Sequence, residues 1–535
     1  MMQSVRNFAV AGVIPRGRGK HSGQRLIFSR QPTLLSQQPR FRTGNSPAEK
    51  RTLTNETTSL TEGNRDLRLR SSSHTNSATT AASARKQYKK PSMVQIPIQG
   101  QAVDFSAVLL RDACSCPSCV HESTNQRLFS TADIPANIAP RVVETCGASD
   151  SIRITWENDV PGFRHDHTTT LKLADLRVTM QSGSAPGSHS DNFSSPVLWS
   201  RDAPSLPDFD YEEYMKDDGT LFSLVRQLRT QGLAFVTNVP ELEESLAAIA
   251  MRIGPIKDTF YGRTWDGMYA SLLFLFNASL IPKAVRTVPA AINAAYTTHE
   301  LGFHTDLLYF EQPPHVQLLH CMRSASSGGA TVFADAYKAA VDLFHTDPEA
   351  FNTLTTVPVN YHYNHPKFNI YHTTKTVIDL QPLRVGESVH STLQSYIEAM
   401  RRIDGERSAM IGWEEALLVN CLDKINWGPP FLAPFSKSED SSARHSQPVL
   451  SALNEKVDRW HDAASKFNAL LQRSEYLYER RMKPGECVLF DNTRTLHSRR
   501  AFNMADVGKP RWLRGTYVDK DPYFSKLRVL QHRFR

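Results

Sequence analysis

The chain has 535 residues, of which 40% are hydrophobic and 22% are charged, enough for one large domain and a smaller one. Its net charge is +8, but residues 1–92 hold 17 Lys and Arg against four acidic residues, so residues 93–535 carry a net charge of −5. Because the basic character belongs to the N-terminal segment, we exclude nucleic acid as a partner.

Residues 1–92 are expected to be a disordered leader followed by a linker. No acidic residue precedes Glu49, and arginines recur among Ser, Gln and small apolar residues, which is typical of a mitochondrial transit peptide. The alternative is a basic disordered tail without a targeting signal, which would leave the protein in the cytoplasm. Residues 54–84 are rich in Ser, Thr, Ala and Asn and cannot bury enough apolar surface to fold. No apolar run reaches the ~18 residues that span a bilayer, so we expect a soluble mature protein without a membrane partner.

Residues 93–180 are expected to form a small β-rich domain. The segment DSIRITWEND at 150–159 has the β-branched composition of a strand. A linker rich in Ser, Gly and Pro follows at 182–196.

A cluster of cysteines lies within this small domain. Cys114, Cys116 and Cys119 fall within six residues in CSCPSC, and such closely spaced thiolates bind a soft metal unless they are buried by chance. Zinc needs a fourth ligand, for which RHDHTTTL offers His165 and His167. A closed set of four ligands would be structural, because it stabilises a domain too small to be stable alone.

Residues 200–535 are expected to form the larger domain. Helical spacing that ends at a glycine predicts helices at 219–232 and 241–254, and an apolar run predicts a strand at 233–239. After residue 290, short strands separated by Pro and Gly turns dominate, among them HVQLLHCM, GATVFADA and KPGECVLFDN. Many short strands with one or two helices favour a β-sandwich or jelly roll over an alternating α/β sheet.

Two histidines and an aspartate in this domain have the chemistry of an iron site. His304 and Asp306 lie two positions apart in FHTDLLYFEQPP, a pattern that is weak evidence alone, because a single strand histidine is usually a core residue. His497 in LFDNTRTLHSRRAF would complete a facial triad, which leaves three positions on Fe(II) open. Arg511 follows 14 residues later and could bind the far carboxylate of 2-oxoglutarate.

From about Ser106 onward the chain resembles the gamma-butyrobetaine dioxygenases, in the taurine and 2,4-D dioxygenase group of Fe(II)/2-oxoglutarate enzymes. The resemblance is carried, in order, by LRDACSCPSC, FYGRTW, AYTTHELGFHTD, PPHVQLLHC, DNTRTLHSRR and SKLRVLQHR. It implies a double-stranded β-helix (jelly-roll) catalytic domain, mainly β with flanking helices, preceded by a zinc-binding domain. It implies these ligands: His304, Asp306 and His497 for iron; Arg511 and Thr331 for 2-oxoglutarate; Cys114, Cys116, Cys119 and His167 for zinc.

The resemblance also implies an aromatic cage for a trimethylammonium substrate. The matching positions are Tyr261, Trp265, Tyr296 and Tyr517, with Asn293 as a ligand of the substrate carboxylate. A quaternary ammonium has no N–H to donate, so aromatic faces are its natural partners. Without the family register, core packing would explain the four aromatic residues equally well.

Three features depart from the family pattern. A tyrosine that follows the aspartate ligand is Leu307 here, and a second substrate asparagine falls on Gly428, with Asn426 close by as a stand-in. Residues 267–284 lengthen the interval between Trp265 and Asn293, and their SLLFLF run is unusually apolar for a loop. We interpret this atypical insertion as a translated intron; the alternative is a genuine loop or lid over the site.

These features predict an Fe(II)- and 2-oxoglutarate-dependent dioxygenase that hydroxylates gamma-butyrobetaine to L-carnitine in mitochondrial carnitine biosynthesis. The resemblance adds ascorbate as a candidate cofactor and a homodimer as the expected assembly. One alternative is trimethyllysine dioxygenase, which uses the same iron chemistry on a substrate with an α-amino acid end. Another is a catalytically silent protein whose zinc-binding domain binds a partner. The cysteine cluster, the AYTT stretch and the SKLRVL tail favour the butyrobetaine enzyme.

Overall fold

The computed structural model describes residues 92–535 apart from 184, 187–192, 202–205, 269–298, 326, 387, 436–446, 504–510 and 535. The predicted leader, most of the insertion at 267–284, and two predicted substrate residues, Asn293 and Tyr296, therefore lie outside the described residues. No helix in the described ranges is long and apolar enough to cross a membrane.

The N-terminal domain is built from two small antiparallel sheets and two short helices. Its elements are β1 (Met93–Ile98), β2 (Gln101–Ser106), α1 (Ala107–Asp112), β3 (Pro140–Cys146), β4 (Ser151–Trp156), β5 (Thr168–Lys172) and α2 (Leu173–Ser182). The strand predicted at 150–159 is confirmed as β4, the central strand of the β3-β4-β5 sheet. Its apolar side chains Ile152 and Ile154 pack against Leu110 and Leu176 in the domain core.

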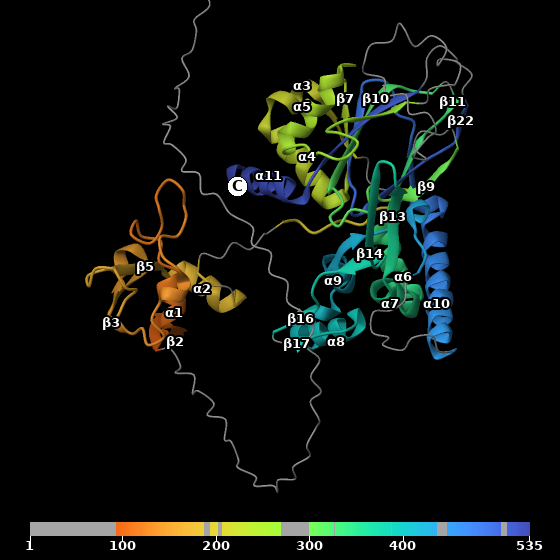
Figure 1. Cartoon of the computed structure of the whole chain (residues 1–535). Coiled ribbons are helices and arrows are strands. Elements are labelled where there is room, and N and C mark those ends of the chain that lie inside the picture. Colours follow the sequence, from red (N-terminus) through yellow and green to blue (C-terminus); the bar gives the residue numbers. More distant parts are fainter. Residues whose placement is uncertain are drawn as a thin grey trace, which may run out of the picture. The chain divides into compact units, whose positions relative to one another are not determined.

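Two facing sheets form the larger domain (Figure 1). The six-stranded sheet has the order β6-β7-β20-β10-β23-β8, with β6 (Asp208–Asp210), β7 (Leu233–Thr237), β20 (Glu486–Asp491), β10 (Val316–Arg323), β23 (Trp512–Val518) and β8 (Trp265–Met268). The four-stranded sheet has the order β19-β12-β21-β9, with β19 (Leu477–Arg480), β12 (Thr331–Asp335), β21 (Thr495–Arg499) and β9 (Leu301–His304).

Aromatic side chains fill the space between the two sheets. The ring of Phe333 on β12 lies 6.1 Å from that of Phe235 on β7 and 5.5 Å from that of Phe490 on β20. Since side chains alternate along a strand, the neighbours of these residues point to the outer faces. The predicted jelly roll, mainly β with flanking helices, is thereby confirmed.

Helices cover the outer face of the six-stranded sheet. They are α3 (Tyr211–Lys216), α4 (Asp218–Gln231), α5 (Glu243–Ile253) and α11 (Lys520–Arg533). The two predicted helices and the strand between them are confirmed as α4, α5 and β7. Helix α4 begins at the Asp217 cap and ends where Gly232 adopts a φ of +70°, a conformation that glycine reaches without steric penalty.

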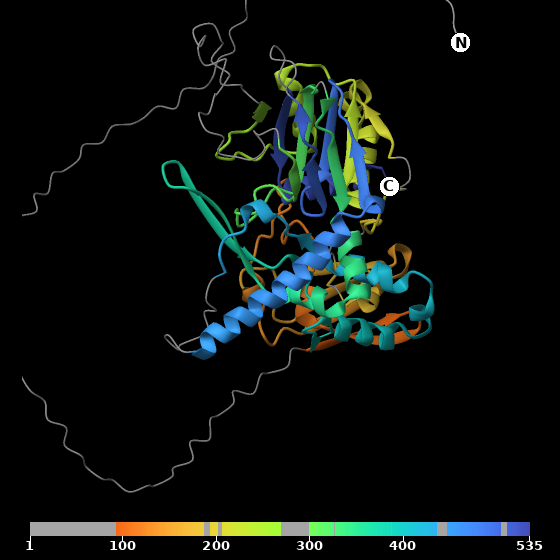
Figure 2. The same ribbon diagram turned by 90° about the vertical axis from the view of Figure 1, so that its right-hand side faces the viewer.

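The part after residue 290 contains more helix than we predicted. The outer face of the four-stranded sheet packs against α6 (Ala336–Thr346), α7 (Pro348–Thr356), α9 (Trp413–Cys421) and α10 (Gln447–Leu471), while α8 (Leu393–Asp404) lies beside them. Figure 2 shows α10 as a long blue helix that extends beyond the sheets. The expectation of one or two helices was wrong because these helices form a long excursion between β12 and β19, which the strand motifs at either end do not reveal.

Short two-stranded pairings complete the domain. They are β13 (Val359–His365) with β14 (Asn369–Lys375), β15 (Ile378–Leu380) with β18 (Leu422–Ile425), β16 (Arg384–Val385) with β17 (Ser388–Val389), and β11 (Ser327–Gly328) with β22 (Phe502–Asn503).

Two candidate metal centres

The first centre lies where β9 and β21 are neighbours. His304 at the end of β9 is the direct cross-strand partner of His497 on β21, and their ring centroids are 4.2 Å apart. Asp306 begins the turn that follows β9. One ligand atom from each of the three side chains lies within 4.8 Å of the others. The fold thus brings together all three residues of the predicted triad.

The protonation of these side chains suits a divalent cation. His304 Nδ1 lies 2.8 Å from the Gly302 carbonyl and donates to it, so Nε2 is the atom that faces Asp306 Oδ1 at 3.3 Å. Burial lowers the pKa of His497 to about 3, which keeps its imidazole neutral. Burial alone would raise the pKa of Asp306, but the adjacent His304 and His497 side chains and the hydrogen bond from the Tyr517 hydroxyl bring it down to about 2, so the carboxyl group is ionised. Two imidazoles and a carboxylate are the donor set that Fe(II) takes in a facial triad.

Two buried donors orient Asp306. Gln317 Nε2 and the Tyr517 hydroxyl donate to the same carboxylate oxygen, Oδ2, at 2.7 and 2.8 Å. Asn492 fixes the backbone of Asp306. Its Oδ1 accepts from the Asp306 N–H at 2.9 Å, and its side-chain amide donates to the Asp306 carbonyl at 3.1 Å. With Oδ2 occupied, Oδ1 is the oxygen left to face the histidines.

Arg511, the predicted 2-oxoglutarate residue, is a half-buried cation just before β23. Burial lowers the pKa of its guanidinium, and Cys321 opposes that shift. The guanidinium lies over the Phe502 ring at 5.6 Å, and a Cβ built on Gly329 would lie 3.4 Å from Arg511 Nε. No carboxylate among the described residues forms an ion pair with Arg511, so it can receive one from a ligand. Thr331, two residues after Gly329, is buried on β12.

Three of the predicted cage aromatics are described, and they lie in one cluster beside Asp306. The rings of Trp265 and Tyr517 are 6.1 Å apart at 31°, and Tyr261 packs in the same cluster. The Trp265 indole lies across the backbone of Gly515, where a Cβ would come within 2.3 Å of its ring. Any larger residue at 515 would therefore displace Trp265. Burial and the Asp306 carboxylate raise the pKa of Tyr517, so its hydroxyl stays protonated and donates.

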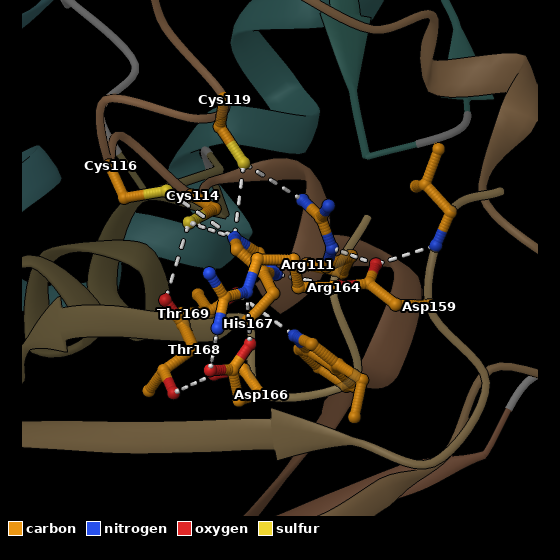
Figure 3. Close-up of polar contacts among 12 residues, drawn as sticks. Arg111, Cys114, Cys116, Cys119, Asp159, Arg164, Asp166, His167, Thr168 and Thr169 are labelled. Atoms are coloured by element: carbon orange, nitrogen blue, oxygen red, sulfur yellow. Dashed lines mark hydrogen bonds and ion pairs between the residues drawn. The ribbon is translucent and has the colours of Figure 1, made fainter. Parts of the chain in front are cut away.

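The second centre joins the cysteine cluster to the start of β5 (Figure 3). His167 Nε2 lies 3.3 Å from the sulfur atoms of both Cys116 and Cys119 and 3.7 Å from that of Cys114. His165 is exposed instead. The structure thus brings together the four predicted zinc residues, with His167 rather than His165.

A hydrogen bond couples the thiols of Cys114 and Cys119 in this second centre. A hydrogen bond from Cys119 lowers the pKa of Cys114 to about 4, while the same bond raises that of Cys119. A bound Zn²⁺ removes the need to share this proton, because it takes three thiolates and one imidazole in a closed tetrahedral site.

Comparison with known proteins agrees with this geometry. Residues 196–517 match the family described as "Taurine catabolism dioxygenase TauD, TfdA family", and residues 85–170 match "Gamma-butyrobetaine hydroxylase-like, N-terminal". The chain belongs to the TauD, TfdA family. It is a 2-oxoglutarate-dependent dioxygenase, as predicted, and Fe(II) and 2-oxoglutarate are the cofactors of this family.

Three relatives are similar to most of this chain. Dioxygenase str8 of Strobilurus tenacellus is 30% identical over 441 residues, which cover 79% of this chain and 84% of that protein. Gamma-butyrobetaine dioxygenase of Pseudomonas sp. (strain AK-1) is 26% identical over 433 residues, which cover 81% and 92%. Mitochondrial trimethyllysine dioxygenase of Gallus gallus is 25% identical over 429 residues, which cover 80% and 83%.

The structure describes the surroundings of the two positions that depart from the family pattern, and it gives a steric reason at Gly428. Leu307 is buried and adopts a φ of +58°, unusual for a branched residue, directly after Asp306. At Gly428 a Cβ would lie 2.5 Å from Leu308 Cδ1, so an asparagine would not fit there without movement of Leu308. Asn426 is no stand-in, because its amide already donates to the Thr376 carbonyl and to Asp379 Oδ2.

Sequence reasoning missed two residues that orient Asp306, namely Gln317 and Asn492. Gln317 carried a usable signal, since it is a polar residue near the start of the mostly apolar strand VQLLHCMR. Asn492 carried none, because its partners lie 178 and 186 residues away in the sequence.

Proposed function

We propose that this dioxygenase hydroxylates gamma-butyrobetaine to L-carnitine, with 2-oxoglutarate and O₂ consumed and succinate and CO₂ released. The observation that carries the proposal is the aromatic wall next to the iron site. Tyr517 donates its hydroxyl to Asp306 while its ring lies beside Trp265. A trimethylammonium group against these faces would lie close to the iron and gain about 0.5–2 kcal/mol from each ring when desolvated.

The proposed roles of the other residues follow from their positions. His304, Asp306 and His497 would hold Fe(II), and Arg511 with Thr331 would hold the far carboxylate of 2-oxoglutarate. Bound Fe(II) and 2-oxoglutarate supply the O₂-dependent decarboxylation that drives hydroxylation. Tyr517 and Gln317 would keep the second oxygen of Asp306 occupied, so that the carboxylate binds the metal through one oxygen.

Trimethyllysine is a second candidate substrate, because relatives that act on either compound are similar to this chain at nearly the same identity. Both compounds carry the trimethylammonium head and differ at the far end. The test is succinate release by the purified protein with each compound in turn, with and without ascorbate. Faster turnover of trimethyllysine would replace the proposed substrate but keep the reaction class. Release with neither compound would reject both.

We further propose one structural zinc ion bound by Cys114, Cys116, Cys119 and His167, which would stabilise a domain at 93–180 that precedes the dioxygenase domain at 200–535. A mitochondrial location and a homodimer complete the proposal. Mass spectrometry of the mature N-terminus from isolated mitochondria and light scattering of the purified protein test these two points.

Replacing Trp265 with Ala is expected to raise the dissociation constant for the trimethylated substrate between about 2- and 30-fold, which corresponds to the loss of one cation–π contact. The dissociation constant for 2-oxoglutarate should stay the same. Trp265→Phe is the matched control, since it keeps an aromatic face. A neutral tert-butyl analogue should bind poorly to the wild type; equal binding of the two compounds would contradict the cage.

Deleting residues 267–284 is expected to leave an active enzyme if this segment is a translated intron. The described start of the segment, Gly267 and Met268, pairs with Leu513 and Trp512 at the end of β8. Val285 and Arg286 would take these positions after the deletion, because the hydrogen bonds of the strand ladder join backbone N–H and C=O groups, which these two residues also carry. The measurement is turnover of the shortened protein, together with sequencing of the mature transcript. Two results together would favour a genuine loop over a translated intron: a mature transcript that encodes all 18 residues, and a full-length protein that turns over substrate faster than the shortened protein.

A further inference from the structure

The N-terminal domain contains a fully buried arginine. Arg111 near the end of α1 is 0% exposed, and its guanidinium lies 4.7 Å from the ring centroids of both Phe129 and Phe163. A buried guanidinium is unfavourable unless anions compensate its charge. Its ion-pair partner among the described residues is Asp159, whose Oδ1 accepts from Arg111 Nε at 2.5 Å.

Arg111 and Asp159 connect two ligands of the cysteine cluster (Figure 3). Arg111 Nη1 lies 3.4 Å from the sulfur of Cys119. The other carboxylate oxygen of Asp159 lies 2.6 Å from Nδ1 of His167, whose Nε2 faces the sulfurs. The contacts therefore run from Cys119 through Arg111 and Asp159 to His167, and both ends of this path belong to the same four-ligand set.

The charges explain why both residues are needed. Zn²⁺ with three thiolates and a neutral imidazole would have a net charge of −1, and the Asp159 carboxylate, whose side chain is 9% exposed, adds another negative charge. Arg111 compensates one of these charges. Its Nη2 is buried and has no hydrogen-bond partner among the described residues, so the Arg111 charge is compensated only by Asp159 and by the nearby Cys119 sulfur. Asp159 accepts from Nδ1–H and thereby leaves Nε2 as the lone-pair donor, the arrangement that outer-shell carboxylates give to zinc-bound histidines.

We propose that Arg111 and Asp159 are positioning residues that retain zinc in the N-terminal domain, Asp159 by orienting His167 and Arg111 by stabilising the Cys119 thiolate. The inference rests on the zinc site proposed above. The inference concerns the rate at which zinc dissociates from the N-terminal domain, which an assay of turnover at the iron site does not measure.

The experiment measures zinc release from the zinc-loaded full-length protein to a chromophoric chelator, well below the melting temperature. Asp159→Asn is nearly isosteric, but its amide has one acceptor oxygen in place of two, so either Arg111 or His167 loses its partner. We expect Asp159→Asn and Arg111→Gln to release zinc at least about tenfold faster, since loss of an outer-shell partner typically lowers metal affinity 10- to 100-fold. Arg111→Lys, which keeps the charge, should restore part of the retention.

Arg127→Gln is the matched control. Arg127 also lies over the Phe129 ring, at 5.3 Å, but it pairs with Asp112 and makes no contact with the cluster. This variant should release zinc at the wild-type rate. A second readout is the absorption spectrum of the Co²⁺-substituted protein, which should shift in Asp159→Asn and stay unchanged in Arg127→Gln.

The outcomes separate this inference from the zinc proposal itself. Wild-type protein without zinc would reject the metal site. Zinc-containing wild type, together with variants that melt earlier but release zinc at the wild-type rate and keep the Co²⁺ spectrum, would show that the pair is merely structural and overturn the inference. If Arg111→Gln does not fold, Asp159→Asn decides the question by the same criteria.

Discussion

Replacing His304 with Ala is expected to lower substrate-dependent succinate release by more than about a hundredfold, since even the loss of an outer-shell partner of a metal ligand costs 10- to 100-fold. His304 presents Nε2 toward Asp306, and its ring lies against His497, so its removal leaves only two of the three proposed iron ligands. Asp306→Ala should have an equally large effect. The measurement is succinate release with gamma-butyrobetaine and with trimethyllysine.

His345→Ala is the control for this experiment, because His345 is an exposed histidine in the last turn of α6. It should keep wild-type turnover. Circular dichroism and zinc content should be unchanged in both variants, because the iron site contributes no ligand to the cysteine cluster. Near-wild-type turnover by His304→Ala would show that the triad is assigned incorrectly.

Replacing Cys116 with Ser is expected to remove zinc and to destabilise the N-terminal domain strongly. Structural zinc in small domains contributes about 10–16 kcal/mol of binding free energy, and this energy stabilises the fold because the site does not exist in the unfolded chain. Cys116 Sγ lies 3.3 Å from His167 Nε2, so the change also removes a neighbour of the imidazole. The measurements are zinc content by metal analysis and the melting temperature. The affinity of the folded fraction for 2-oxoglutarate should change far less.

Cys146→Ser controls for the loss of a thiol in the same domain. Cys146 lies at the end of β3 and is not part of the cluster, so zinc content and melting temperature should match the wild type. Freshly purified, reduced wild-type protein that contains no zinc would contradict the proposed site. His167→Ala should reproduce the effect of Cys116→Ser, whereas His165→Ala, at an exposed position, should not.

The sequence by itself determined the features that depend on residues near one another in the chain. His304 and Asp306 lie two positions apart, and a strand end followed by a turn brings both to one point without help from the rest of the fold. The three cysteines span six residues, so a single tight turn is enough to gather them. Helix α4 likewise begins and ends at its own local signals, Asp217 and Gly232.

Only the tertiary structure decided which distant residues complete each centre. His497 meets His304 across 193 residues because β21 and β9 are neighbours in one register, and a shift of one residue would turn His497 to the outer face. The same dependence on register places Gln317 and Tyr517 against Asp306. In the N-terminal domain, Asp159 meets both Arg111 and His167 only after the chain has folded back on α1. Local spacing determines which side chains can bind a metal, whereas the pairing of distant segments determines their orientation and charge compensation.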